Sequence, residues 1–104
     1  MDQVIQDKTV FVLSTPRGRG AIAIVRVTGP ETSQTIEIIT KKQTPQPRTG
    51  TLRPLYHPTD GHLMDEALVL YFKGPQSYTG EDMAEFHLHG GLAVVEDVLD
   101  ALGG

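Results

Sequence analysis

The sequence predicts a small α+β domain in which two strands, a helix, three strands and a second helix follow one another. Two observations carry this prediction. Five short runs rich in β-branched and aromatic residues are separated by turns of Gly, Pro and polar residues, as strands usually are. Two other segments repeat apolar residues at helical spacing. With 104 residues, of which 38% are hydrophobic, the chain has room for one compact domain that buries roughly two thirds of its unfolded surface.

Two strands are predicted near the start of the chain. Residues 9–13 (Thr-Val-Phe-Val-Leu) form a short apolar run that ends at Ser14-Thr15-Pro16. Residues 21–28 are apolar on both faces except at Arg26, a pattern typical of a central strand. The turn between them, residues 17–20 (Arg-Gly-Arg-Gly), resembles an anion-binding nest, although a turn with solvated arginines is the simpler interpretation.

A helix is predicted in the middle of the chain. Gly29-Pro30 ends the second strand and starts the helix, because proline fits the first helical turn. The helix should reach about Thr40, with Ile36 and Ile39 pointing inward. Residues 41–50 are polar and carry prolines, so we expect a surface loop there.

Three strands and a second helix complete the prediction. Residues 51–56 and 66–72 read as two strands, joined by a hairpin reversal at Asp60-Gly61. A fifth strand is expected over residues 82–88. After Gly90-Gly91 an amphipathic helix should turn one stripe of apolar residues into the core: Leu92, Val95, Val98, Leu99 and Leu102.

The fifth predicted strand carries a carboxylate in its middle. Strand alternation places Met83, Glu85 and His87 on one face, and Ala84, Phe86 and Leu88 on the other. A carboxylate or a guanidinium in the interior costs several kcal/mol unless a partner meets it. Arg26, in its apolar strand, has the same need. Two interpretations remain open, a structural Arg26–Glu85 ion pair and a ligand site, and the two can coexist.

Other candidate chemistry is weaker. His87 and His89 alternate, with His57 and His62 as further histidines, but a dedicated zinc site usually shows a tighter ligand set, so no metal site is predicted. No histidine and carboxylate arrangement marks a hydroxyl as a nucleophile, so no catalytic residue is assigned. The chain has no GxxxxGK[ST] loop, so it should not hydrolyse GTP or ATP on its own.

The charges are divided unevenly along the chain, whose net charge is -4. Up to His57 there are eight Lys or Arg and four Asp or Glu, whereas the remainder has one Lys and nine Asp or Glu. Such polarity can steer two copies together or attract an anionic ligand to the basic part, although solvated surface charge is the simpler interpretation for most of these residues. Basic residues are too few, and lack interleaved aromatics, for nucleic-acid binding by this chain alone.

The composition also bears on location. No apolar run approaches the ~20 residues of a membrane span, and the N-terminus lacks the basic-then-apolar order of a signal peptide. Zero cysteines exclude a disulfide framework and thiolate zinc sites, and fit a reducing compartment. We therefore expect a cytoplasmic protein without a membrane partner.

Two glycine-marked blocks carry a family resemblance that spans nearly all of the chain. Residues 15–29 (Thr-Pro-Arg-Gly-Arg-Gly-Ala-Ile-Ala-Ile-Val-Arg-Val-Thr-Gly) and residues 74–91 (Gly-Pro-Gln-Ser-Tyr-Thr-Gly-Glu-Asp-Met-Ala-Glu-Phe-His-Leu-His-Gly-Gly) resemble the N-terminal domain of the tRNA modification GTPases MnmE, also called TrmE. The resemblance implies a β2-α-β3-α folate-binding fold similar to the glycine cleavage aminomethyltransferase. It also implies a homodimer formed by exchange of the first strands.

The resemblance implies a site as well. It aligns Arg26 and Glu85 with residues that contact a tetrahydrofolate derivative, such as 5-formyltetrahydrofolate, and a carboxylate suits the paired N–H groups of a pterin. Tyr78 would lie with its hydroxyl at the rim of this site. His87 and His89 would also be rim residues. Gly90 would bring backbone close to the flat ligand.

The resemblance further implies what the chain would not contain. Residues 1–104 would be one domain, a fragment without the helical domain, the GTPase domain and the C-terminal cysteine motif, and a folate-site lysine of the family would follow the second helix. GTP, magnesium and potassium would bind only in the parent protein, which acts on the wobble uridine of tRNA with the flavin-dependent partner MnmG/GidA and serves one-carbon transfer. The alternatives are a purely structural dimerisation module, with Arg26–Glu85 as an ion pair, and an autonomous transferase, which has few candidate catalytic groups.

Overall fold

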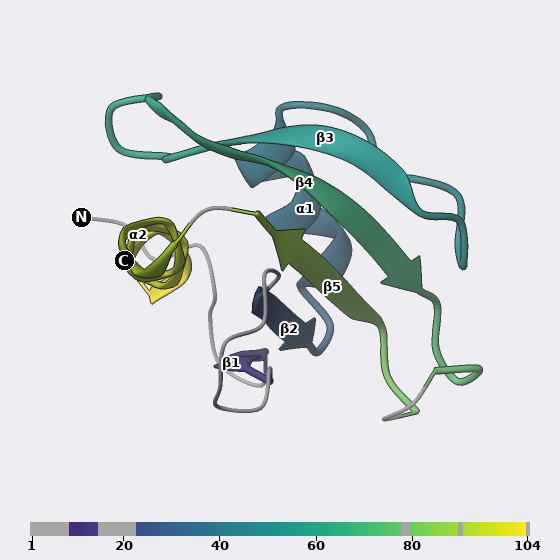
Figure 1. Ribbon diagram of the computed structural model, residues 1–104. Coiled ribbons are helices and arrows are strands. Elements are labelled where there is room, and N and C mark those ends of the chain that lie inside the picture. Colours follow the sequence, from purple (N-terminus) through teal and green to yellow (C-terminus); the bar gives the residue numbers. More distant parts are fainter. Residues whose placement is uncertain (1–8, 15–22, 78–79, 90, 104) are drawn as a thin grey trace.

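The computed structural model describes residues 9–14, 23–77, 80–89 and 91–103. These residues form one antiparallel sheet and two helices (Figure 1). The elements in chain order are β1 (Val10–Leu13), β2 (Ala23–Thr28), α1 (Thr32–Thr40), β3 (Thr51–Tyr56), β4 (Leu63–Phe72), β5 (Met83–Leu88) and α2 (Leu92–Gly103). The α+β class and the predicted order of elements are therefore confirmed.

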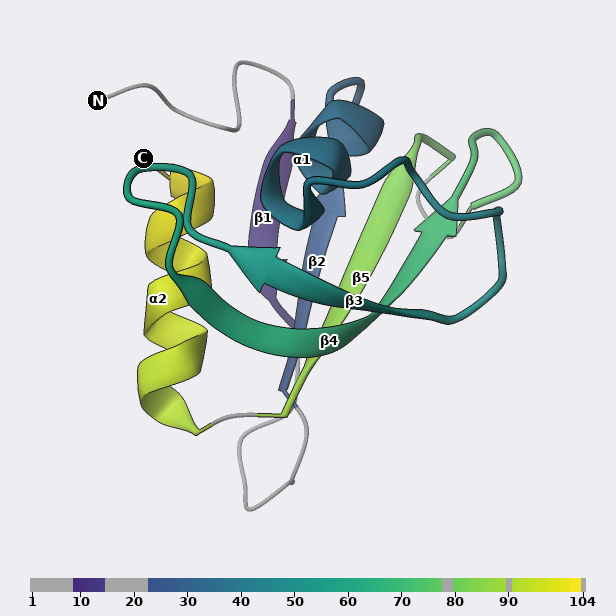
Figure 2. The same ribbon diagram turned by 90° about the horizontal axis from the view of Figure 1, so that it is seen from above.

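The sheet places the last strand at its centre. The strand order is β1-β2-β5-β4-β3, and every neighbouring pair is antiparallel (Figure 2). The prediction that residues 21–28 form a central strand is confirmed for β2, which lies between β1 and β5. The Asp60-Gly61 reversal is also confirmed, because β3 and β4 pair across it and Gly61 has a φ of 79°.

β1 and β5 each begin one residue later than predicted, and the starts of β4 and α1 differ by more. β4 begins at Leu63 instead of residue 66, because the pairing with β3 continues to Tyr56↔Leu63 past a bulge between Leu55 and Tyr56. α1 begins at Thr32, two residues after Pro30, where the Thr32 hydroxyl donates to the carbonyl of Gly29 at 2.8 Å.

The hydrophobic core lies on one face of the sheet. β2, β4 and β5 supply Val25, Val27, Ala67, Val69, Tyr71, Ala84, Phe86 and Leu88. The helices cover this face with Ile36, Ile39, Val95, Val98 and Leu102, as their spacing predicts, and with Ala101, which the prediction did not include. The predicted Leu99 is partly buried against this core. The prediction is wrong for Leu92, which is 73% exposed because it is the first residue of α2 and lies beyond the core.

The other face of the sheet carries polar side chains at its centre. Glu85 and His87 alternate with the buried Ala84, Phe86 and Leu88, which confirms the predicted period of two. Met83 shares the face of Glu85, and it is buried although it lies apart from the core cluster.

The connection between β4 and β5 is held closely by Asp82. Its side chain accepts the Gly74 N–H at 2.9 Å, and its backbone carbonyl accepts the Gly29 N–H at 2.9 Å. A Cβ on Gly74 would lie 2.8 Å from the carbonyl carbon of Glu81 and 2.9 Å from the carbonyl oxygen of Gly80. Gly74 is therefore required by a close backbone approach that fixes where β5 starts.

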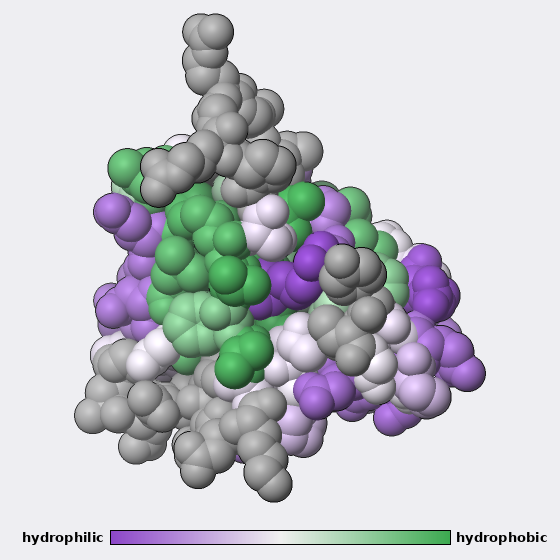
Figure 3. Space-filling model, turned by 90° about the horizontal axis from the view of Figure 1, so that it is seen from below, coloured by the Kyte–Doolittle hydropathy of each residue, from purple (hydrophilic) through white to green (hydrophobic). Residues whose placement is uncertain are grey.

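The two edges of the sheet differ in character. β1 exposes Val10, Val12 and Leu13, with Val10 62% and Val12 54% exposed. β3 carries Pro54, which has no backbone N–H to donate and so discourages pairing at a sheet edge. Figure 3, which views the molecule from the side of β1, shows hydrophobic side chains gathered on that surface. Neither described helix is long and apolar enough to cross a membrane.

Candidate functional site

Three polar side chains from β2 and β5 meet on the face of the sheet opposite the core. Arg26 and Glu85 are directly opposed in the antiparallel register of these strands. The Arg26 Nη2 donates to Glu85 Oε2 at 2.7 Å, and His87 Nε2 lies 3.0 Å from Glu85 Oε1. The pairing of Arg26 with Glu85 predicted as one interpretation is therefore present.

The carboxylate of Glu85 is the most enclosed of the three groups. Its side chain is 14% exposed, compared with 28% for Arg26 and 19% for His87. Burial raises the pKa of Glu85, but the hydrogen bonds from His87 and from Arg26 lower this pKa by more, so that it falls below its ordinary value. Glu85 is consequently ionised at neutral pH.

The carboxylate of Glu85 has lone pairs that its contacts with Arg26 and His87 do not use. A carboxylate offers about four lone-pair positions, and the two described contacts use one at each oxygen. The remaining positions suit two adjacent N–H donors in a fork, such as those at the edge of a pterin. Leu70 lies opposite Glu85, and Leu68 opposite His87, both half-buried, so apolar surface borders the carboxylate.

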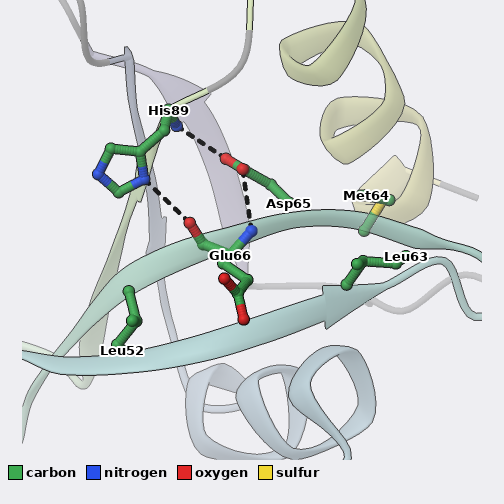
Figure 4. Close-up of a pocket in the computed structure, with 6 residues that line it drawn as sticks. All are labelled: Leu52, Leu63, Met64, Asp65, Glu66 and His89. Carbon is green, nitrogen blue, oxygen red and sulfur yellow. Dashed lines mark hydrogen bonds between the residues drawn. The ribbon is translucent and has the colours of Figure 1, made fainter.

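A groove of about 500 Å³ lies beyond the end of β5, around His89 (Figure 4). The backbone N–H of His89 donates to Asp65 Oδ2 at 2.7 Å, and its Nδ1 lies 2.9 Å from the carbonyl oxygen of Glu66. A carbonyl only accepts, so this contact assigns a proton to Nδ1. The groove is lined by Leu52, Leu63, Met64, Asp65, Glu66 and His89.

The character of this groove limits what it can hold. Its apolar side chains favour a flat or aliphatic group, while Asp65 and Glu66 disfavour an anion. His89 is four residues beyond Glu85, a strand distance of roughly 13 Å. The groove therefore lies farther along β5 than the Glu85 carboxylate. Its acidic residues disfavour an anion, whereas Arg26 attracts one.

The predicted site residues are only partly brought together. Arg26 and Glu85 are in contact, and His89 lies in the groove. Tyr78, Gly90 and the 17–20 turn lie outside the described residues. His87, which the sequence placed at the rim, contacts the carboxylate itself, and the alternation of Glu85 and His87 on one strand face was the available signal. Within the described ranges, no group of three or more His, Asp or Glu residues could hold a metal ion.

Comparisons with known proteins identify a family and several relatives of this chain. The family model described as GTP-binding protein TrmE N-terminus matches residues 9–103. The chain is 48% identical over 103 residues to the 5-taurinomethyluridine-[tRNA] synthase subunit GTPB3, mitochondrial, of Mus musculus, which covers 98% of the chain and 21% of that protein. It is 49% identical over 96 residues to the tRNA modification GTPase MnmE of Beijerinckia indica, covering 92% of the chain and 21% of that protein.

A third relative extends the comparison to fungi. The tRNA modification GTPase mss1, mitochondrial, of Schizosaccharomyces pombe is 46% identical over 99 residues, which are 95% of the chain and 20% of that protein. The chain thus spans about a fifth of the length of the curated relatives it matches.

Proposed function

This chain belongs to the family of TrmE N-terminal domains, and we propose that it binds a tetrahydrofolate derivative, such as 5-formyltetrahydrofolate, and forms a homodimer. The relatives are named as tRNA modification proteins, so the setting we propose is a GTPase that modifies the wobble uridine of tRNA. The domain would hold the one-carbon cofactor in place for that reaction.

The observation that carries the proposal is the Arg26–Glu85–His87 arrangement. Glu85 is ionised, and each of its two oxygens has one contact, from Arg26 or from His87. Its remaining lone pairs can accept hydrogen bonds from two adjacent N–H groups of a ligand. A pterin bound there would rest against the half-buried Leu68 and Leu70. A folate ends in an anionic glutamate, which the carboxylates of Asp65 and Glu66 would repel, so we place its tail on the side of Arg26.

The proposal of a homodimer is supported by the difference between the two edge strands of the sheet. β1 offers an apolar edge, whereas Pro54 interrupts the row of N–H donors along the edge formed by β3. A second copy, whose first strand pairs at β1, is the proposed occupant of the open edge. Exchange of the first strands is the form of pairing that we propose for it.

The remaining functions would belong to the rest of a longer protein. Binding of GTP, magnesium and potassium, contact with MnmG/GidA and contact with tRNA are all proposed for the whole protein. The cytoplasmic location predicted from the sequence also stays a prediction, because relatives named mitochondrial occur beside the bacterial one.

Calorimetric titration with 5-formyltetrahydrofolate tests the ligand site. We expect the wild-type chain to bind, and Glu85→Gln to weaken binding about 10- to 100-fold, because one charge-assisted hydrogen bond contributes about 1.5–3 kcal/mol. The matched control is Glu66→Gln, which removes the same charge from the groove beside His89. The control should bind at least as well as the wild type.

The same titration separates the two candidate functions. A purely structural dimerisation module is the second candidate, favoured by the observation that Arg26 and Glu85 already pair at 2.7 Å. Absence of binding by the folded wild-type chain would support that candidate, or a folate site that needs the lysine which the resemblance places after the second helix. Equal loss in both variants would show that general charge, and not the Glu85 fork, governs affinity.

Light scattering at micromolar concentrations tests the dimer. We expect the wild type to dimerise and Val12→Lys to weaken dimerisation at least about tenfold, since a charge on an edge strand opposes pairing with another chain. Leu52→Lys is the control, because Leu52 is 59% exposed on β3, at the opposite edge. A wild type that is monomeric, or a control that dissociates as readily as Val12→Lys, would contradict the proposed edge.

A further inference from the structure

The turn between β3 and β4 is joined to α2 by two histidines. Figure 2 shows this turn beside the helix. His57 contacts Asp100 and His62 contacts Asp97, with the two aspartates three residues apart on α2. The two imidazole rings stack, with centroids 5.2 Å apart and an interplanar angle of 24°. Glu85 contacts Arg26 and His87 instead, so the two histidines of the turn play no part in the proposed folate site.

The contacts of His62 require a particular protonation state. Its Nδ1 lies 2.5 Å from Asp60 Oδ1 in the turn, and its Nε2 lies 2.7 Å from Asp97 Oδ2 on α2. A carboxylate only accepts hydrogen bonds, and a neutral imidazole has a single N–H to donate. Both contacts can therefore be satisfied together only by the doubly protonated, cationic ring.

The contacts of His57 require the opposite state. Its Nδ1 accepts the Thr59 backbone N–H at 3.2 Å, so the remaining proton must be on Nε2, which faces Asp100 Oδ2 at 2.9 Å. This arrangement is complete with a neutral ring. His57 is 6% exposed, whereas the His62 side chain is 45% exposed and open to exchange of protons with solvent.

The charges around His62 come from three elements. Asp60 lies in its own turn, and Asp97 and Asp100 lie on α2. Lys41, which follows α1, has its Nζ 4.7 Å from the centre of the Tyr56 ring, on the approach to the same turn. Three carboxylates thus outnumber the one lysine, which favours a positive charge on His62.

We propose that His62 is a proton-dependent latch that holds α2 against the β3–β4 turn, beside a His57–Asp100 contact that needs no added proton. When His62 loses its second proton, one of its two nitrogens becomes an acceptor facing a carboxylate. The contact with Asp60 or that with Asp97 must then open. The Asp60 contact is local to the turn, so loss of the Asp97 contact is the event that loosens the helix.

The direction of the pH dependence follows from the two partners. Hydrogen bonds with Asp97 and with Asp60 raise the pKa of His62, so the stabilisation is present below the ordinary histidine range and is lost as the pH rises through the raised value. The backbone and side-chain contacts with His62 lower the pKa of Asp60, so at the acidic end the stabilisation is lost as the pH falls through that lowered value. The latch should hold between these two limits.

An NMR titration of the histidine rings tests the latch in the full 104-residue chain. We expect His62 to titrate above about 6.5, the ordinary value for histidine, and Asp97→Asn to move its midpoint down by at least about 0.5 unit. The matched control is Glu96→Gln, which removes the same charge from an exposed neighbouring position on α2. A wild-type midpoint at or below about 6.5, or equal shifts in the two variants, would overturn the proposal.

Amide hydrogen exchange tests the consequence for the helix. After correction for the intrinsic dependence on pH, protection of α2 should fall several-fold as the pH rises through the His62 midpoint, while protection of β2 and β5 stays level. His62→Gln keeps one hydrogen-bonding nitrogen but carries no titrating proton, so α2 should lose this pH dependence. Persistence of the dependence in His62→Gln, or a parallel loss of protection in β2 and β5, would overturn the proposal.

Discussion

Replacing Phe86 by alanine should lower the free energy of unfolding by about 3–5 kcal/mol, as expected for deletion of a fully buried aromatic side chain. Phe86 lies at the middle of the central strand β5 and is 0% exposed. Its direct cross-strand partners are Val25 on β2 and Val69 on β4, both also 0% exposed. Because these partners are themselves fully buried and close-packed, the cavity should remain largely open in the variant.

Urea unfolding gives the measurement, and Phe72→Ala is the control. Phe72 is the last residue of β4, faces away from the core and is half-buried, with the Arg48 guanidinium 5.6 Å from its ring centre. The same substitution there should cost clearly less. If Phe86→Ala does not fold, Phe86→Leu should fold with a loss of about 1.5 kcal/mol. Equal losses at Phe86 and Phe72 would mean that β5 is not the centre of the core.

The local pattern of the sequence was sufficient to predict the elements. Strands with a period of two, such as β5, and helices with buried Ile36 and Ile39 follow from side-chain direction alone. The Asp60-Gly61 turn likewise follows from the positive φ that glycine adopts there. The start of β4 was missed because the extra pairing past Leu55 depends on a bulge, which leaves no clear local signal.

The arrangement of the elements depends on contacts between distant residues. Arg26 and Glu85 are 59 residues apart in the chain, and the sequence could suggest their pairing only because each is a charged residue between two apolar neighbours in a strand. The position of β5 between β2 and β4 brings them together, and the sequence pattern did not indicate that strand order. The contacts from His57 and His62 to α2 also join distant residues. The sequence could not predict them, because histidines in a polar turn do not indicate which helix they contact.

A double-mutant cycle on Arg26 and Glu85 should show strong coupling between the two residues. Arg26→Met leaves the Glu85 carboxylate without its guanidinium in a site where it is only 14% exposed, so we expect a loss of about 2–3 kcal/mol in the free energy of unfolding. This value is below the 3–5 kcal/mol of a fully buried pair, roughly in keeping with the 28% exposure of Arg26. The double variant Arg26→Met/Glu85→Met should lie within about 1 kcal/mol of the wild type, because a well-packed apolar pair often matches a buried ion pair.

Urea unfolding of the four proteins at neutral pH measures the coupling, since Glu85 is ionised there. Met83→Leu serves as the control for repacking on the same face of β5, and it should cost less than about 1.5 kcal/mol. Additive losses in the double variant would contradict the expected coupling. They would show that Arg26 and Glu85 stabilise the fold independently of one another.

The cycle also decides why these charges occupy apolar strands. If the double variant keeps its stability but no longer binds 5-formyltetrahydrofolate, the fold does not require the pair, and its role lies with the ligand. A double variant that is 2 kcal/mol or more less stable, roughly the loss expected from breaking the pair, would assign it to the fold and favour the dimerisation module. His87 strengthens the first expectation, because its contact with the second oxygen of Glu85 adds orientation to a carboxylate that Arg26 already neutralises. A structural ion pair needs only one partner for the carboxylate. A carboxylate that binds two adjacent N–H groups of a ligand must keep one orientation, and contacts at both of its oxygens maintain that orientation.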